Sequence, residues 1–163
     1  MKSLHELWVP CELTKRACLK AGFSGPIEIL HTPCNEFIEP SIVQIPSPIS
    51  QRLMLSSGTY KFYSIFQWNE RMGYSNLLWA YYKEFDYEED VVLILKVNPM
   101  LMSKHGLAKI RSDILAMKRK SGKKRLPKVF LITNTISREE ILGLHSLGDT
   151  FVLPHYGEGW GMP

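Results

Sequence analysis

The sequence has little cysteine, no long hydrophobic run and no targeting signal at its start. Its three cysteines show no metal-site spacing, and their odd number argues against a disulfide framework. The longest apolar strand-like run, residues 91–95, is far too short to span a bilayer. The first six residues lack the apolar core of a signal peptide. We therefore expect a soluble, cytoplasmic protein without a transmembrane segment or a bound metal.

Internal repeats and low-complexity tracts are also missing. A length of 163 residues suggests one domain with an appended segment. The net charge of +4 is mild, so it fits an anionic ligand without arguing for one. Prolines recur between residues 33 and 48, and few regular elements tolerate that density. This region is expected to be a linker or an extended connection.

The chain after residue 58 alternates between strand-like and helix-like patterns. Strands are expected at 60–66, 91–97, 128–133 and 151–153, and helices at 73–85, 103–120 and 137–147. The apolar runs at 91–97 and 128–133 are expected to form buried strands. Ser137 and Glu140 form a capping box at the start of the last helix. The long helix is expected to turn five residues inward: Leu107, Ile110, Ile114, Leu115 and Met117. This alternation predicts an α/β fold, a Rossmann-like parallel sheet flanked by helices.

Ligands of such sheets bind beyond the carboxyl ends of the strands, so three loops are of interest: 67–73, 133–136 and 154–163. The last loop has glycine at alternate positions from 157 to 161, with Glu158 between the first two. Glycines let the backbone approach a ligand and point its N–H groups at it. A neighbouring carboxylate can accept hydrogen bonds from hydroxyls. The pattern predicts a site for a polyhydroxylated, phosphate-bearing ligand.

The glycine stretch at 157–163, together with the strand before it at 149–154, is the most specific motif of the chain. Further motifs precede it at 7–11, 29–35 and 62–73. In this order and spacing the motifs resemble the donor-binding, C-terminal domain of retaining glycosyltransferases of the GT-B fold, in particular family 4 (group 1 type). The resemblance places residues 1–50 at the end of an acceptor-side domain and its connection. Residues 51–163 would form a nucleotide-sugar-binding Rossmann-like domain, incomplete at its C-terminus.

The resemblance implies transfer of a sugar, with retention, from a nucleotide-diphosphate donor of the UDP or GDP type. The acceptor would be a hydroxyl of a glycan, lipid or protein, and no metal or other cofactor would be required. Glu158 would be the catalytic carboxylate that contacts the hydroxyls of the donor sugar. The remaining expected donor-binding residues are Arg71, Gln67, Thr133, Asn134, Gly159, Trp160, Gly161 and Met162.

The sequence departs from the family pattern in charge and in length. Gln67 and Met72 stand where the family carries basic residues, which leaves Arg71 as the cation of that loop. Since a leaving nucleoside diphosphate needs positive charge, the loss of a cation would lower the rate roughly 10²–10³-fold. A second family Glu, eight positions after Glu158, would lie past Pro163. We expect this chain alone to be inactive as a glycosyltransferase. The alternative function is that of a non-catalytic nucleotide-sugar-binding or interaction module of the same fold.

Two smaller features leave other hypotheses open. Basic residues cluster at 118–125, which favours a solvated helix end, with a polyanion-binding surface as a weaker alternative. The cluster has no interleaved aromatic residues in sequence, so a nucleic-acid partner is disfavoured. His155 lies near the glycine stretch and could reach a phosphate. No Ser/His/Asp arrangement has the context of a hydrolase triad.

Overall fold

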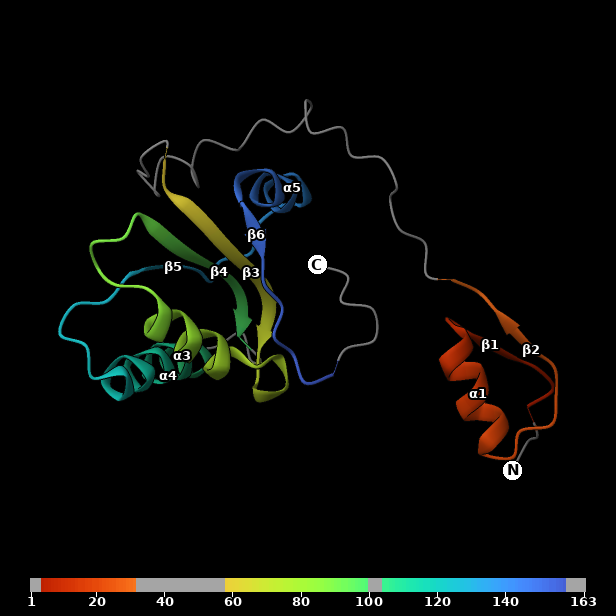
Figure 1. Ribbon diagram of the computed structural model, residues 1–163. Helices are drawn as coiled ribbons and strands as arrows, with labels where there is room; N and C mark the ends of the chain where they lie inside the picture. Colours follow the sequence, from red (N-terminus) through yellow and green to blue (C-terminus); the bar gives the residue numbers. More distant parts are fainter. Residues whose placement is uncertain (1–3, 32–57, 100–103, 158–163) are drawn as a thin grey trace. The chain divides into compact units, whose positions relative to one another are not determined.

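The computed structural model describes residues 4–31, 58–99 and 104–157. The chain divides into two compact units, Met1–Glu39 and Pro40–Pro163 (Figure 1). The domain boundary expected at residue 50 lies outside the described residues.

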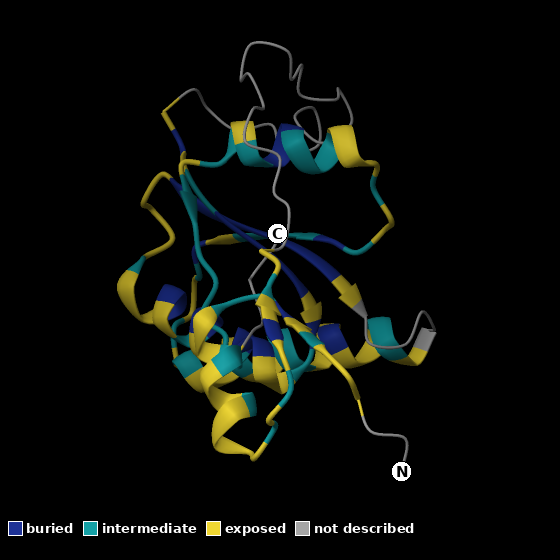
Figure 2. Cartoon of the chain, turned by 90° about the vertical axis from the view of Figure 1, so that its right-hand side faces the viewer, coloured by how far each residue is buried: buried dark blue, intermediate teal, exposed yellow. Residues whose placement is uncertain are grey.

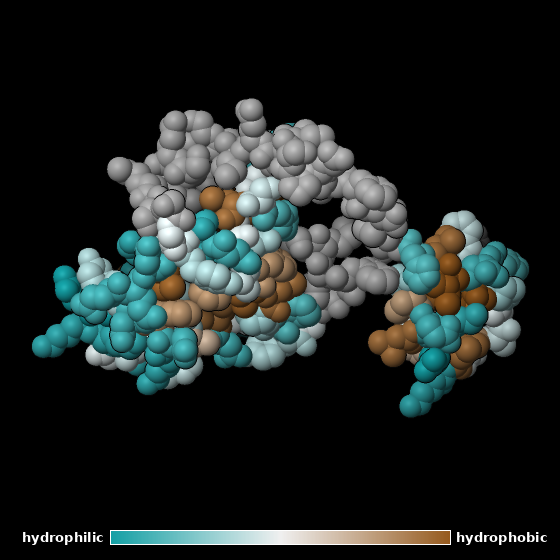
Figure 3. Space-filling model, turned by 45° about the horizontal axis from the view of Figure 1, so that its top comes forward, coloured by the Kyte–Doolittle hydropathy of each residue, from teal (hydrophilic) through white to brown (hydrophobic). Residues whose placement is uncertain are grey.

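The N-terminal unit is a single β-α-β unit. Strand β1 (Leu7–Val9), helix α1 (Glu12–Lys20) and strand β2 (Ile27–Ile29) follow one another, and β1 and β2 pair in parallel. Val9 and Ile27 are buried, whereas Trp8 and Leu13 are exposed to 70% and 78%. Apolar side chains accordingly gather on the surface of this unit (Figure 3).

The larger unit is a four-stranded sheet flanked by helices. Its elements, in chain order, are β3 (Tyr60–Trp68), the 3-10 helix η2 (Glu70–Met72), α3 (Tyr74–Glu84), β4 (Val91–Pro99), α4 (Lys104–Ser121), β5 (Lys128–Ile132), α5 (Arg138–Leu147) and β6 (Thr150–Phe151). All pairings are parallel, in the order β5-β4-β3-β6. The chain therefore moves outward from β3 to β5 and then crosses back to the other side of β3. The strand order reverses between β3 and β6, and ligands of open α/β sheets bind at such a point.

Helices cover both faces of this sheet, so its central strands β3 and β4 are largely buried (Figure 2). On one face α3 and α4 pack against alternate residues of β4, among them Leu93, Leu95 and Val97. On the other face α5 packs against the intervening residues, including Val92 and Ile94. The capping box predicted at Ser137 is present, since its side chain accepts from the Glu140 N–H and the Glu140 side chain accepts from the Ser137 N–H.

Three details of the predicted elements are wrong. Leu115 was expected to point inward but is 50% exposed, because Ile110, Ile114 and Met117 already form the inward stripe of α4. Strand β5 was expected to be buried, yet it begins exposed and is mostly half-buried, since within the described sheet it pairs on one side only. Gln67 was placed in a loop but lies within β3, opposite Asn98 of β4.

Candidate functional site

Two loops meet at the carboxyl edge of the sheet, where the strand order reverses. One is the turn after β3, residues 69–73, and the other follows β6, residues 152–157. The Tyr156 N–H donates to the Arg71 carbonyl over 2.8 Å, and Asn76 Nδ2 donates to the Tyr156 hydroxyl over 2.7 Å. In Figure 1 the segment after β6 runs beside the turn that precedes α3. The tertiary structure thus joins two of the three loops that the sequence singled out.

Gly73 makes the close approach of these loops possible. It ends η2 and precedes α3 with a left-handed φ of 67°. A β-carbon at this position would lie 2.1 Å from the Pro154 carbonyl oxygen. Both the backbone conformation and the space therefore require glycine. The result is a helix start, with its first N–H groups, placed directly beside the chain that follows β6.

Arg71 brings positive charge to the junction of the loops. Its Nη1 donates to the carbonyl oxygen of Gly157, the first glycine of the glycine stretch. The side chain is exposed and lies one turn before the N-terminus of α3. A helix N-terminus carries about half a positive charge, so guanidinium and helix dipole together favour an anion here.

A partly buried polar network holds the turn after β3 in place. Asp113 of α4 accepts hydrogen bonds at Oδ2 from Trp68 Nε1 (2.9 Å) and the Tyr74 hydroxyl (3.0 Å), and Lys109 contacts its other oxygen. Burial alone would raise the pKa of Asp113, but hydrogen bonds from Lys109, Trp68 and Tyr74 together lower it. The Trp68 and Tyr74 rings stack with centroids 4.2 Å apart. The residues that flank Arg71 are therefore anchored on both sides.

Two buried polar atoms in the same loops lack a hydrogen-bond partner among the described residues. They are Oδ1 of Asn69, after β3, and Nδ1 of His155, after β6. Buried polar groups are nearly always paired, so each such atom calls for an explanation. Their position marks both loops as places where the described residues do not complete the hydrogen bonding of the protein.

The remaining expected site residues fall into three groups. Thr133 and Asn134 follow β5, two strands away from β3, and Asn134 donates to the Thr135 carbonyl over 3.2 Å. Gln67 is exposed at the carboxyl edge, whereas Met72 is 5% exposed and packs into the core on the α3 face. The expected residues Glu158, Gly159, Trp160, Gly161 and Met162 lie outside the described residues.

Lys96 is a site candidate that the sequence analysis missed. It lies near the carboxyl end of β4 and is 3% exposed. Its Nζ donates to Asn98 Oδ1 over 2.7 Å, and burial lowers its pKa. In the sequence, the feature that could have indicated this candidate is a lysine within the otherwise apolar run 91–97.

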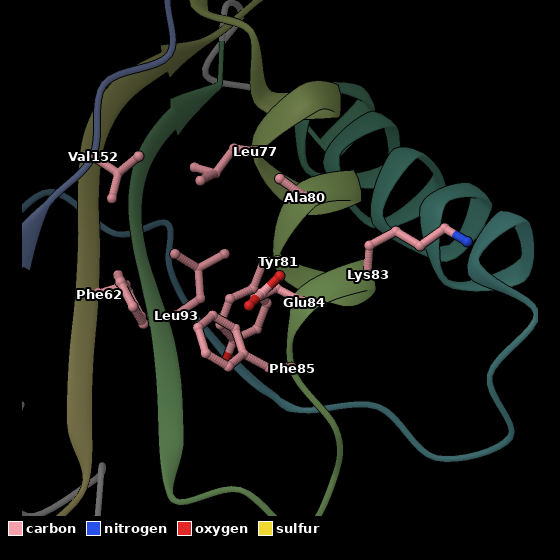
Figure 4. A pocket seen from close by; sticks show the side chains of 9 residues that line it. All are labelled: Phe62, Leu77, Ala80, Tyr81, Lys83, Glu84, Phe85, Leu93 and Val152. Carbon is pink, nitrogen blue, oxygen red and sulfur yellow. The ribbon is translucent and has the colours of Figure 1, made fainter.

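The structure also has an apolar pocket of about 460 Å³ away from this edge. It lies between α3 and the sheet, and its side chains come from the amino half of β3 and β4, from residues 77–85 of α3 and its C-cap, and from Val152 (Figure 4). Lys83 belongs to its rim, and Figure 4 shows its side chain extending toward α4, away from the cavity. A charged sugar nucleotide needs polar and cationic partners, so the carboxyl edge suits such a ligand better than this pocket.

The basic segment 118–125 lies against acidic residues of the α3–β4 loop. Lys123 Nζ is 2.6 Å from Asp86 Oδ1 and 2.9 Å from the Phe85 carbonyl, and Arg125 lies 3.8 Å from Glu88. The segment itself contains no aromatic residue, but aromatic rings from other parts of the chain lie beside its basic side chains. Lys83 and Lys120 both lie within 5.0 Å of the Trp79 ring centroid, and Arg125 stacks on Tyr87. The segment is thus partly neutralised by its own neighbours.

Two features are absent from the described part of the chain. It contains no helix long and apolar enough to cross a membrane. It also contains no group of three or more His, Cys, Asp or Glu residues placed to hold a metal ion.

No protein-family profile and no curated protein matches this sequence. Solved structures do share its fold. A structure of apo OtsA superposes with a TM-score of 0.67 over 95% of this chain at 12% identity. An E. coli structure described as trehalose-6-phosphate bound with UDP-2-fluoro glucose gives the same three values. The N-terminal domain of trehalose-6-phosphate phosphatase from Candida albicans gives a TM-score of 0.61 over 93% of this chain at 14% identity.

This chain spans 39–41% of the length of those structures. At such low identity the likeness shows the fold alone. OtsA is a glycosyltransferase of the GT-B fold, so the α/β, Rossmann-like architecture predicted from the sequence is confirmed.

Proposed function

We propose that this chain binds the nucleotide-diphosphate part of a sugar donor and serves glycosyl transfer, with retention, to an acceptor hydroxyl. The observation that carries the proposal is the position of Arg71. Its guanidinium joins the turn after β3 to the start of the glycine stretch, at the point where the strand order reverses. That is where an α/β sheet of this kind receives a ligand.

The chemistry at this junction fits a diphosphate. Arg71 offers a planar fork of N–H donors, which matches phosphate oxygens in pairs. The N-terminus of α3 follows Arg71 through Gly73, and its helix dipole adds partial positive charge to this junction. As the bond from the sugar to the diphosphate breaks, negative charge grows on the leaving oxygens. Fixed donors at that position stabilise the transition state more than the ground state.

The donor sugar is assigned to Glu158 and to the backbone N–H groups of residues 159–162. This part of the proposal rests on the family resemblance of the glycine stretch. It predicts that Glu158→Ala weakens the binding of UDP-glucose or GDP-mannose more than the binding of free UDP or GDP. Equal losses for the sugar nucleotide and the free nucleotide would refute a role in sugar binding.

The binding of the diphosphate is tested by calorimetry and thermal unfolding with UDP, GDP and uridine at millimolar concentration. We expect one of the two diphosphates, but not uridine, to raise the melting temperature. Arg71→Met should weaken that binding about tenfold or more, since charge-assisted hydrogen bonds contribute about 1.5–3 kcal/mol. Arg111→Met on the exposed surface of α4 is the matched control and should bind as the wild type does. Absence of any nucleotide effect on the wild type would refute the proposal.

A non-catalytic binding module of the same fold is the second candidate. It is favoured by Met72, whose side chain is in the core where the family carries a cation that faces the donor. Both candidates predict nucleotide binding. They differ in whether the bound UDP- or GDP-sugar is turned over, which hydrolysis or transfer assays would show as released nucleoside diphosphate.

A further inference from the structure

Lys96 is the only charged side chain that is buried in the described part of the chain. A buried ammonium is costly unless it is paired and hydrogen-bonded. It lies on the central strand β4, between β3 and β5, near the carboxyl edge where ligands of this fold bind. A lysine in this position therefore calls for a specific counter-charge.

The register of the sheet shows which way Lys96 faces. It lies opposite Ile65 of β3 and Ile132 of β5, and both pack in the core beneath α5. Two residues further along β4, toward the carboxyl edge, Asn98 lies opposite Gln67 of β3, and both side chains are exposed. Alternation along the strands places Gln67, Lys96 and Asn98 on the same face.

The ammonium reaches the rim of this face. Its Nζ is 2.7 Å from Oδ1 of the exposed Asn98, so the aliphatic stem is buried while the head points toward the edge. An ammonium has three N–H donors, and within the described residues one of them has an acceptor. The described ion pairs do not include Lys96. Its counter-ion is therefore not among the described carboxylates.

We propose that Lys96 binds a phosphate oxygen of the sugar-nucleotide donor, with Asn98 and Gln67 as neutral hydrogen-bonding neighbours. The inference rests on the proposed function and deepens it. It assigns to the end of β4 the second positive charge that the turn after β3 lacks, since Gln67 is neutral and Met72 is buried. Arg71 and Lys96 would then contact the diphosphate from the ends of two neighbouring strands.

The test compares Lys96→Met with the wild type by calorimetry, using UDP, GDP, inorganic pyrophosphate and uridine as probes. Methionine keeps the length of the stem and removes the charge. We expect UDP or GDP, and pyrophosphate, to bind about ten- to a hundredfold more weakly, with uridine unaffected. Lys118→Met, on the exposed end of α4, is the matched control and should change nothing. Lys96→Gln is a second variant in case the methionine variant does not fold.

The possible outcomes separate this inference from the proposed function. Unchanged diphosphate affinity in Lys96→Met, with a wild type that binds, would overturn the role of Lys96 alone. A wild type that binds pyrophosphate through Lys96 but neither nucleotide would support the anion site and overturn the nucleotide proposal. Binding of no anion at all would overturn both. A large fall in the melting temperature of both Lys96→Met and Lys96→Gln without ligand would overturn the inference, because it would assign Lys96 a structural role.

Discussion

The α-carbon of Gly73 lies against the carbonyl of Pro154, so close that a β-carbon on Gly73 would be 2.1 Å from that oxygen. The contact joins the turn after β3 to the segment after β6, and it places Arg71 and the start of α3 at the candidate site. Gly73→Ala should therefore destabilise the fold by about 2–4 kcal/mol. About 1–2 kcal/mol comes from the left-handed conformation, and the remainder from the clash.

Urea unfolding measures this loss, and Gly122 offers a matched control. Gly122 has nearly the same φ, 71°, but a β-carbon there would meet nothing within 4 Å. Gly122→Ala should therefore cost only the conformational part, about 1–2 kcal/mol. Equal losses for the two variants would show that the Pro154 contact has no energetic weight.

Asp113 should make stability depend on pH. Its pKa is lower in the folded state than the unfolded value of about 3.9, so its contribution is complete above that value. The contribution is lost as pH falls through the lower, folded pKa. Asp113→Asn removes the charge that Trp68 and Tyr74 donate to, and should cost about 1–3 kcal/mol at pH 7. The difference in free energy of unfolding between the wild type and Asp113→Asn should narrow below about pH 4.

Urea unfolding at pH 7, 5 and 3.5 gives this comparison. Asp149→Asn is the control, because Asp149 also has a lowered pKa, through hydrogen bonds from Lys61, but it is exposed. Solvent screening should keep its effect well under about 1 kcal/mol. A constant gap between wild type and Asp113→Asn at all three pH values would contradict the role of the Asp113 charge.

Tyr156→Phe should affect ligand binding more than stability. The variant loses the hydrogen bond from Asn76 that fixes the segment after β6 beside α3. Because Tyr156 is 70% exposed, unfolding free energy should change by less than about 0.5 kcal/mol. Diphosphate affinity should fall roughly two- to tenfold, as expected for one neutral hydrogen bond. Tyr87→Phe, in the loop that follows the C-terminal end of α3, is the control, and an equal effect there would argue against positioning by Tyr156.

The basic segment 118–125 should bind heparin only weakly. Lys123 is held by Asp86 and by the carbonyl of Phe85, and Arg125 lies near Glu88, so two of the six basic side chains of the segment lie near carboxylates. Heparin chromatography should show elution at low salt, with little change in Lys124→Glu. Lys123→Met should instead lower stability by about 1 kcal/mol, because Lys123 caps the last carbonyls of α3. Strong, salt-dependent retention that Lys124→Glu abolishes would favour a polyanion-binding surface.

The sequence by itself determined the elements and their order. Helix and strand periodicities and the capping box at Ser137 depend on residues within about four positions of each other, and these predictions are confirmed. The alternation of strands and helices also implied a parallel sheet, because parallel strands need crossover connections. The carboxyl edge of the sheet could thus be predicted as the place of the candidate site.

Only the tertiary structure decided which side chains reach that edge. Arg71 meets Gly157 across 86 residues of sequence, a contact that depends on the crossover from β5 to β6. Met72 points into the core while Arg71 points outward, because the η2 turn rotates successive side chains apart. The position of Lys96 is set by the register in which β4 pairs with β3 and β5. Local patterns carry no information on such directions, since they arise only when distant strands pair and close the core.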